Sequence, residues 1–100
     1  MSDLEQIRPD LVLGRRAPAV EPELATARVA WAGVVGAAAA MSSYPARIAG
    51  DTLVIVCSSA PWAGELGILR RDLGTRLAHL TGRPLELRFE VGDVPEASTS

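Results

Sequence analysis

The stretch Gly50-Asp51-Thr52-Leu53-Val54-Ile55-Val56-Cys57-Ser58 decides the fold, because it joins a tight turn to an apolar strand. Gly-Asp between two strand-like runs is a hairpin signal, so we expect strands over residues 47–49 and 52–58. Successive side chains of a strand point to opposite faces. The second strand is apolar on both of its faces, which favours a central strand covered on both sides. The residues facing one side are Leu53, Ile55 and Cys57, and those facing the other are Val54 and Val56.

An apolar stripe upstream of the hairpin predicts one helix that begins near Glu21 and is closed by Pro45. Apolar residues recur there at intervals of three and four, which is one face of a helix. Pro22 suits the first helical position. Gly33 and Gly36 weaken a helix by about 1 kcal/mol each relative to alanine, so we expect them to admit another backbone at close range. The stripe consists of Leu24, Ala27, Trp31, Val34, Ala38 and Met41.

Downstream of the hairpin, the pattern predicts a second amphipathic helix and a final strand. Ser59 is a suitable N-cap, Pro61 fits the first turn, and Gly82 is placed to end the helix. After Gly82, apolar and charged residues alternate strictly from Leu85 to Val91, which is typical of a half-buried strand. The helical stripe consists of Trp62, Leu66, Leu69, Leu73, Leu77 and Leu80.

These elements predict an α+β domain with the order α-β-β-α-β. The simplest packing is a small, mostly antiparallel three-stranded sheet with two helices on one face, which is the outline of a KH-like domain. We expect this domain to span residues 21–92. Residues 1–20 are expected to be a partly ordered N-terminal arm, and residues 93–100 a flexible tail.

Composition limits the function classes. The 100 residues carry a net charge of −2, and all ten basic residues are arginine. Residues 6–92 hold ten arginines against eight acidic residues, a net charge of +2, which permits weak phosphate contact but does not demand it. A single cysteine forms no internal disulfide and offers no metal-ligand set, so a cytoplasmic location is expected. The uncharged stretch 29–46 is too short in its apolar part to span a membrane, so we expect a buried helix there.

No enzymatic pattern accompanies the reactive residue types. His79 with Ser58 or Ser59 lacks the strand-turn-helix elbow of a hydrolase, and we expect a surface histidine. No phosphate-binding Walker loop is present, so ATP use is not expected. We therefore expect neither catalytic residues nor a metal or cofactor, and we interpret Cys57 as a small core residue.

Four segments in order resemble one known family. They are Trp31-x-x-Val34-Val35-Gly36, then Gly50-Asp51-Thr52-Leu53-Val54-Ile55-Val56, then Ser58-Ser59-x-x-Trp62-Ala63-x-Glu65-Leu66, and finally Leu87-Arg88-Phe89-x-Val91-Gly92. This run, over residues 21–92, resembles the DciA family. The turn reads Gly-Asp here, where the family usually has Asp-Gly.

The resemblance implies a KH-like, non-catalytic domain that binds the replicative helicase of the DnaB type and promotes its loading onto DNA. It also implies contact with single-stranded or forked DNA. Many members carry a long extension beside the domain. In this chain about twenty residues precede the core and eight follow it, so we expect helicase contact to come mainly from the domain.

The candidate partner-binding residues are apolar, and each has a second interpretation. Trp31 and Trp62 are either partner anchors or core residues, since tryptophan is common at hot spots and both lie on apolar stripes. Val54 and Val56 form a partner or dimer surface if the outer side of the sheet is open. If the N-terminal arm covers that side, they are buried instead.

The candidate nucleic-acid contacts are arginines, either in a DNA-facing patch or as ordinary solvated charges. Gly33-Val34-Val35-Gly36 matches the G-x-x-G of KH domains, but it falls inside one helix, so helix packing is the better account. Two functions stay open: a helicase-binding interaction domain, and a general single-stranded DNA- or RNA-binding KH-like module without a helicase partner. The arginines are Arg15, Arg16, Arg47, Arg70, Arg71 and Arg76, with Arg83 as a further candidate.

Overall fold

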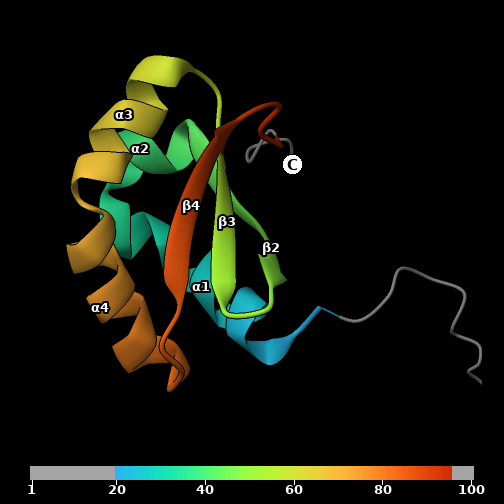
Figure 1. Ribbon diagram of the computed structural model, residues 1–100. Helices are drawn as coiled ribbons and strands as arrows, with labels where there is room; N and C mark the ends of the chain where they lie inside the picture. Colours follow the sequence, from blue (N-terminus) through green and yellow to red (C-terminus); the bar gives the residue numbers. More distant parts are fainter. Residues whose placement is uncertain (1–19, 96–100) are drawn as a thin grey trace, which may run out of the picture.

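A three-stranded sheet with helices packed on one of its faces forms the domain (Figure 1). The computed structural model describes residues 20–95. The α+β class is confirmed, but each predicted helix is two helices, so the five-element order was too simple. The elements are α1 (Pro22–Val35), α2 (Ala37–Met41), β2 (Ser43–Ala49), β3 (Thr52–Cys57), α3 (Ala60–Ile68), α4 (Arg70–Thr81) and β4 (Glu86–Val91).

The sheet has the order β2-β3-β4, so the apolar strand β3 is central, as its two apolar faces predict. The predicted Gly50-Asp51 turn is confirmed: Ala49 pairs with Thr52 across it, and Gly50 has φ 64°. The expectation of a mostly antiparallel sheet was wrong, because β3 and β4 are parallel. The helices α3 and α4 carry the chain back along the sheet, so β4 begins at the same end as β3.

Gly36 divides the first predicted helix. Its φ of 94° and ψ of 157° lie outside the helical region, in a conformation that glycine adopts readily. The expected close approach of another backbone was wrong, because a Cβ built on Gly33 or Gly36 meets nothing within 4 Å. The break also changes the buried stripe: Ala39 is buried, whereas Met41 is 77% exposed.

The second predicted helix is interrupted at Leu69, whose φ of −93° and ψ of 11° end α3 and precede α4. This break leaves Leu69 half-exposed, and Leu80 at the far end of the stripe is also half-exposed. The predicted boundaries are confirmed. Ser59 is the N-cap residue, although its side chain makes no capping bond. Gly82 ends α4 with φ 74°, and its N–H donates to the carbonyl of Ala78.

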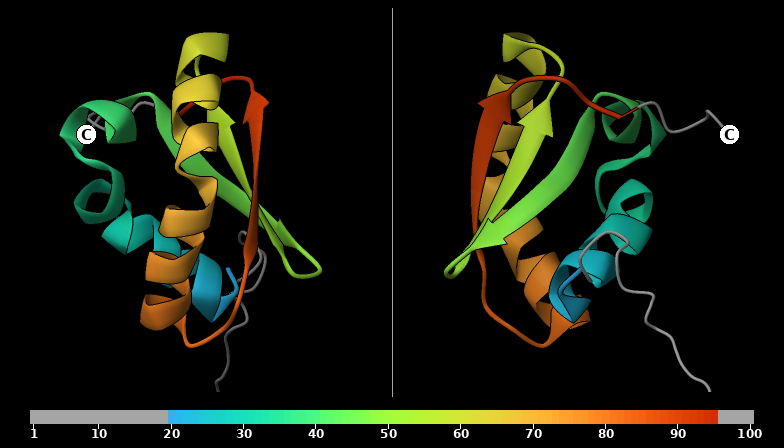
Figure 2. Two further views of the ribbon diagram at one scale, coloured as in Figure 1. Left: turned by 60° about the vertical axis from the view of Figure 1, so that its left-hand side comes forward. Right: turned by 90° about the vertical axis from the view of Figure 1, so that its right-hand side faces the viewer.

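All four helices lie on the same side of the sheet (Figure 2). Leu53, Ile55 and Cys57 face them and are fully buried. A buried hydrogen-bond chain fixes the helices to the sheet: the Trp31 indole N–H donates to Ser43 Oγ at 2.9 Å, which donates to the Ala39 carbonyl at 2.6 Å. Ser43 is also the first residue of β2, so this strand begins four residues earlier than predicted.

Candidate functional site

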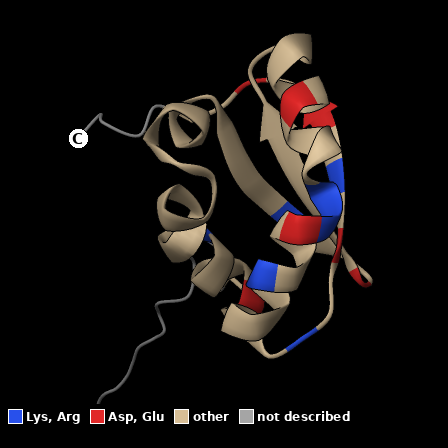
Figure 3. Ribbon diagram, turned by 90° about the vertical axis from the view of Figure 1, so that its left-hand side faces the viewer, with Lys and Arg blue, Asp and Glu red and all other residues tan. Residues whose placement is uncertain are grey.

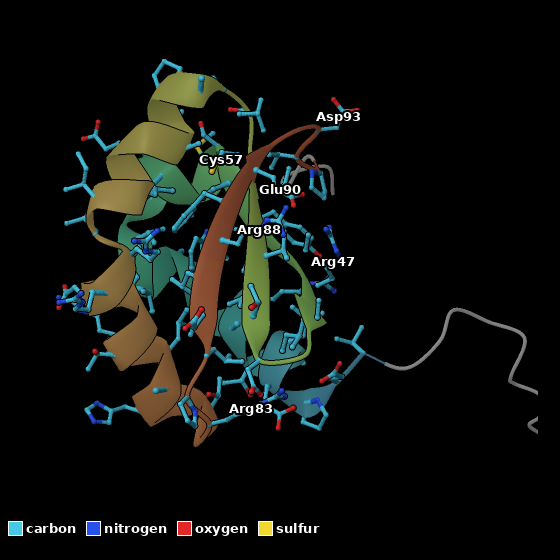
Figure 4. All side chains as sticks on the ribbon, in the orientation of Figure 1. Arg47, Cys57, Arg83, Arg88, Glu90 and Asp93 are labelled. Atoms are coloured by element: carbon cyan, nitrogen blue, oxygen red, sulfur yellow. The ribbon has the colours of Figure 1, made fainter. Side chains whose placement is uncertain are left out.

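The face of the sheet away from the helices carries a small charged network. Arg47 Nη2 lies 3.5 Å from Glu90 Oε2, and Arg88 Nε lies 3.3 Å from the same oxygen. The first pair joins β2 to β4 across the central strand, and Figure 4 shows the three side chains close together. Val54, next to Arg47 and Arg88 in the strand register, is 2% exposed.

This burial changes the predicted apolar surface. Val54 offers almost no accessible area, and Val56 is half-buried beside Glu90. The accessible part of this face is therefore mainly polar. The alternative expectation, that the N-terminal arm covers Val54 and Val56, involves residues outside the described range.

The two tryptophans have different environments. Trp31 is 3% exposed and bonded to Ser43, which places its side chain in the core. Trp62, in the first turns of α3, is partly exposed and packs against the edge of the core. Of the two candidate anchors, only Trp62 presents surface to a partner.

The predicted arginines do not converge on one patch. Arg47 lies on the open face of the sheet, whereas Arg70, Arg71 and Arg76 lie on α4, which covers the opposite face. Figure 3 shows charges of both signs along α3 and α4. Arg76 Nε lies 3.6 Å from Asp72 Oδ2. Two further candidates, Arg15 and Arg16, lie outside the described residues.

Arg70 and Arg71 are distinct within this set. Both are exposed, and neither makes an ion pair with any residue in the range 20–95. They occupy the first turn of α4, where the helix dipole is positive and disfavours cations. The C-terminal end of α3 directly precedes them and carries the opposite partial charge, so the two helix dipoles oppose each other at these residues.

Arg83 is a structural clamp. Its guanidinium donates to the carbonyl of Gly50, and it lies 3.3 Å from Asp51, 3.7 Å from Glu21 and 3.9 Å from Glu23. It thus ties the hairpin turn to the start of α1 (Figure 4). Three nearby acids make it a poor phosphate ligand, and the sequence alone did not indicate this role because the acids come from two distant segments.

Arg28 is a contact that the sequence analysis missed. From α1 its Nε and Nη2 donate to the carbonyls of Pro45 and Ala46, each at 2.9 Å. Its guanidinium also lies 4.6 Å from the centroid of the Tyr44 ring, a cation–π contact. The one sequence feature that could have indicated this contact is that Arg28 is the only charged residue in α1 beyond its first turn.

A hollow of about 870 Å³ lies between α4 and the start of β4. Its lining includes Arg70, Arg71, Gly74 and Glu86, and also Ile68, which is 83% exposed. A Cβ added to Gly74 would lie 3.4 Å from the Leu85 carbonyl oxygen, so α4 and the segment before β4 are close together at this point. The hollow therefore joins exposed apolar surface to Arg70 and Arg71, which make no ion pair within residues 20–95.

The two reactive residues singled out from the sequence lie on different elements, His79 on α4 and Cys57 on β3. His79 is exposed in the last turn of α4, and Cys57 is buried, which raises the pKa of its thiol. Within residues 20–95, no three His, Cys, Asp or Glu side chains are grouped to hold a metal ion. None of the helices in that range is long and apolar enough to cross a membrane.

Comparison with known families gives a match over most of the chain. The family described as "Dna[CI] antecedent, DciA" matches residues 4–89. No curated protein matches the chain. The family is related to loaders of the DnaB helicase and is not a catalytic one. Because the match extends over most of the sequence, this chain belongs to the DciA family.

Proposed function

We propose that this chain binds the DnaB-type replicative helicase and assists its loading onto DNA at the start of replication. The observation that carries the proposal is the family match over residues 4–89. We propose that residues 21–92 form the binding module and that this module is KH-like. We also propose that the protein acts in the cytoplasm, at the nucleoid.

The helicase-binding surface that we propose lies around the junction of α3 and α4. Large apolar side chains are exposed there: Ile68 is 83% exposed and Leu69 is 47% exposed. Trp62 adds a partly exposed aromatic ring from the start of α3. Exposed apolar side chains next to charges are typical of a protein-binding surface. Trp31 and Val54 contribute indirectly, by holding the elements that carry this surface.

Direct contact with DNA is proposed to be weak. Between residues 20 and 95 there are seven arginines against eight acidic residues. A protein that depends on phosphate contact concentrates positive charge on one face. The mechanism therefore relies on the helicase to hold DNA, while this domain favours a ring state that admits the strand.

The alternative is a single-stranded DNA- or RNA-binding module without a helicase partner. The observation in its favour is the pair Arg70 and Arg71, which are exposed and make no ion pair within the described part of the chain. This alternative requires strong binding to single strands that falls steeply as salt rises.

A titration of the chain against the DnaB-type helicase of the same organism, at physiological salt and without DNA, tests the proposal. Saturable binding with a dissociation constant of about 1 μM or below is expected. The matched titration uses a fluorescent oligo-dT and the same buffer. Absence of helicase binding together with salt-sensitive binding to oligo-dT would establish the alternative.

Loading itself needs a second assay. Helicase unwinding of a forked duplex, with the chain added at increasing concentration, is expected to begin sooner and reach a higher amplitude. Trp62→Ala and Ile68→Ser are expected to weaken both helicase binding and this stimulation. Met41→Ser is the control, because Met41 is similarly exposed on α2 but does not line the α4–β4 hollow.

A further inference from the structure

The two edges of the sheet differ in their backbone hydrogen bonding. At the β2 edge, Arg28 donates to the carbonyls of Pro45 and Ala46, and Pro45 has no N–H. The register of β2 also shifts between Pro45 and Arg47. Bulges, proline and a covering charged group are the devices that protect an edge strand from pairing with another chain. The β2 edge is therefore closed.

The β4 edge is less protected: among the described residues it has no bulge, no proline within the strand and no side chain bonded to its backbone, although the strand carries the charged residues Glu86, Arg88 and Glu90. The N–H groups of Glu86 and Gly92 donate to the carbonyls of Asp51 and Cys57, so the even-numbered residues of this segment face β3. Backbone groups of successive strand residues point to opposite sides. The N–H and C=O groups of Leu87 and Phe89 are therefore directed to the outer edge, where the sheet has no further described strand.

The open edge adjoins the hollow beside α4. Leu85 and Leu87 contribute to its wall, and exposed Ile68 lies at its α3 end. Arg70 and Arg71 line the same hollow from the first turn of α4. A strand edge and two arginines that have no partner within residues 20–95 thus share one concave surface with an apolar contact.

We propose that β4 accepts an extended, acidic segment of the helicase as an added strand, with Arg70 and Arg71 pairing with its carboxylates; this inference rests on the proposed function. Strand addition obtains affinity from main-chain hydrogen bonds and specificity from side-chain contacts beside the edge. A peptide satisfies the edge N–H and C=O groups of Leu87 and Phe89, which a nucleic acid does not.

The first test reverses the two charges. The double variant Arg70→Glu/Arg71→Glu is expected to weaken helicase binding by about tenfold or more, because complementary charges become repulsive. Arg76→Glu is the matched control: it reverses a charge on the same helix, outside the hollow, and is expected to change binding by less than about twofold. Circular dichroism of all variants checks that each is folded.

The second test detects the added strand by measuring amide hydrogen exchange in β4, for the chain alone and for its complex with the helicase. The amides of Leu87 and Phe89 are expected to exchange at least about tenfold more slowly in the complex, because added main-chain bonds protect them. The amide of Glu86, already bonded to Asp51, reports any general stabilisation.

The outcomes separate this inference from the proposed function. If the wild-type chain does not bind the helicase, both are overturned. If it binds, but the double variant binds equally well or the two amides are not protected, only the strand addition is overturned. Loss of oligo-dT binding in the double variant with helicase binding intact would assign the arginines to DNA instead. Protection that grows with chain concentration in the absence of helicase would assign the edge to a second copy.

Discussion

The two faces of the sheet bury the same apolar strand by different means. On one face, Ile55 and its neighbours pack under four helices and lose all contact with water. On the other, Val54 lies beneath charged side chains that remain partly exposed. The comparison teaches that the two faces of one strand can be buried by two kinds of contact. The helix-covered face depends on shape and volume, and the open face on charges that solvent screens.

Truncation of the central strand gives the largest expected difference between the faces. Ile55→Ala is expected to lower the free energy of unfolding by about 2–5 kcal/mol, because it leaves a cavity in close-packed surroundings. Val56→Ala is expected to cost about 1 kcal/mol or less, since Val56 is only half-buried on the open face. Chemical denaturation of both variants measures the two losses. Equal losses would mean that the open face is packed as tightly as the helix side.

The helix-covered face also depends on one backbone conformation. Gly36→Ala is expected to cost about 1–3 kcal/mol, because φ 94° with ψ 157° is strained for any residue with a Cβ. Gly33→Ala is the matched control within the same helical layer. It lies in the interior of α1 with nothing within 4 Å of its added Cβ, so it is expected to stabilise by about 0.5–1 kcal/mol. Thermal unfolding of the pair should shift the melting temperature in opposite directions.

These two glycines illustrate what sequence could and could not predict. The turns and helix ends could be predicted from the sequence. The Gly50-Asp51 turn, the Ser59 boundary and the end of α4 at Gly82 follow from local residue preferences. The interruption at Gly36 could not be predicted, since the apolar spacing continues through it. Apolar residues at intervals of three and four indicate which face of a helix is buried. They do not indicate whether a residue between them has backbone dihedral angles outside the helical region.

The pairing of the strands was also beyond local pattern. An alternating run such as Glu86–Val91 is the same whether its neighbour is parallel or antiparallel. The direction of β4 depends on how α3 and α4 cross the sheet, which is a tertiary property. The arrangement of the candidate site is likewise a tertiary property. Arg70 and Arg71 were selected from sequence, but their separation from Arg47 by the whole sheet, and the role of Arg28 at its edge, needed coordinates.

Alkaline pH is expected to act on the helix-covered face. Burial raises the pKa of the Cys57 thiol above its ordinary value, because the thiolate loses its solvation there. The unfolded chain therefore releases this proton first as the pH rises. The stabilisation is complete below the ordinary thiol pKa and is lost as the pH rises through the folded pKa. Unfolding titrations of the wild type and Cys57→Ala over this range should diverge, and parallel curves would contradict the assignment.

Salt is expected to act on the open face, with the smallest effect. Arg47 and Glu90 are 56% and 32% exposed in their side chains, and such a pair contributes about 1 kcal/mol or less. A double-mutant cycle with Arg47→Ala and Glu90→Gln isolates their coupling energy. This energy should shrink between low and high salt, because mobile ions screen exposed charges. Ile55→Ala should keep its full cost over the same range, because a cavity holds no charge to screen. A coupling energy that ignored salt would mean that the pair is desolvated, and the open face would then be a second buried face of the sheet.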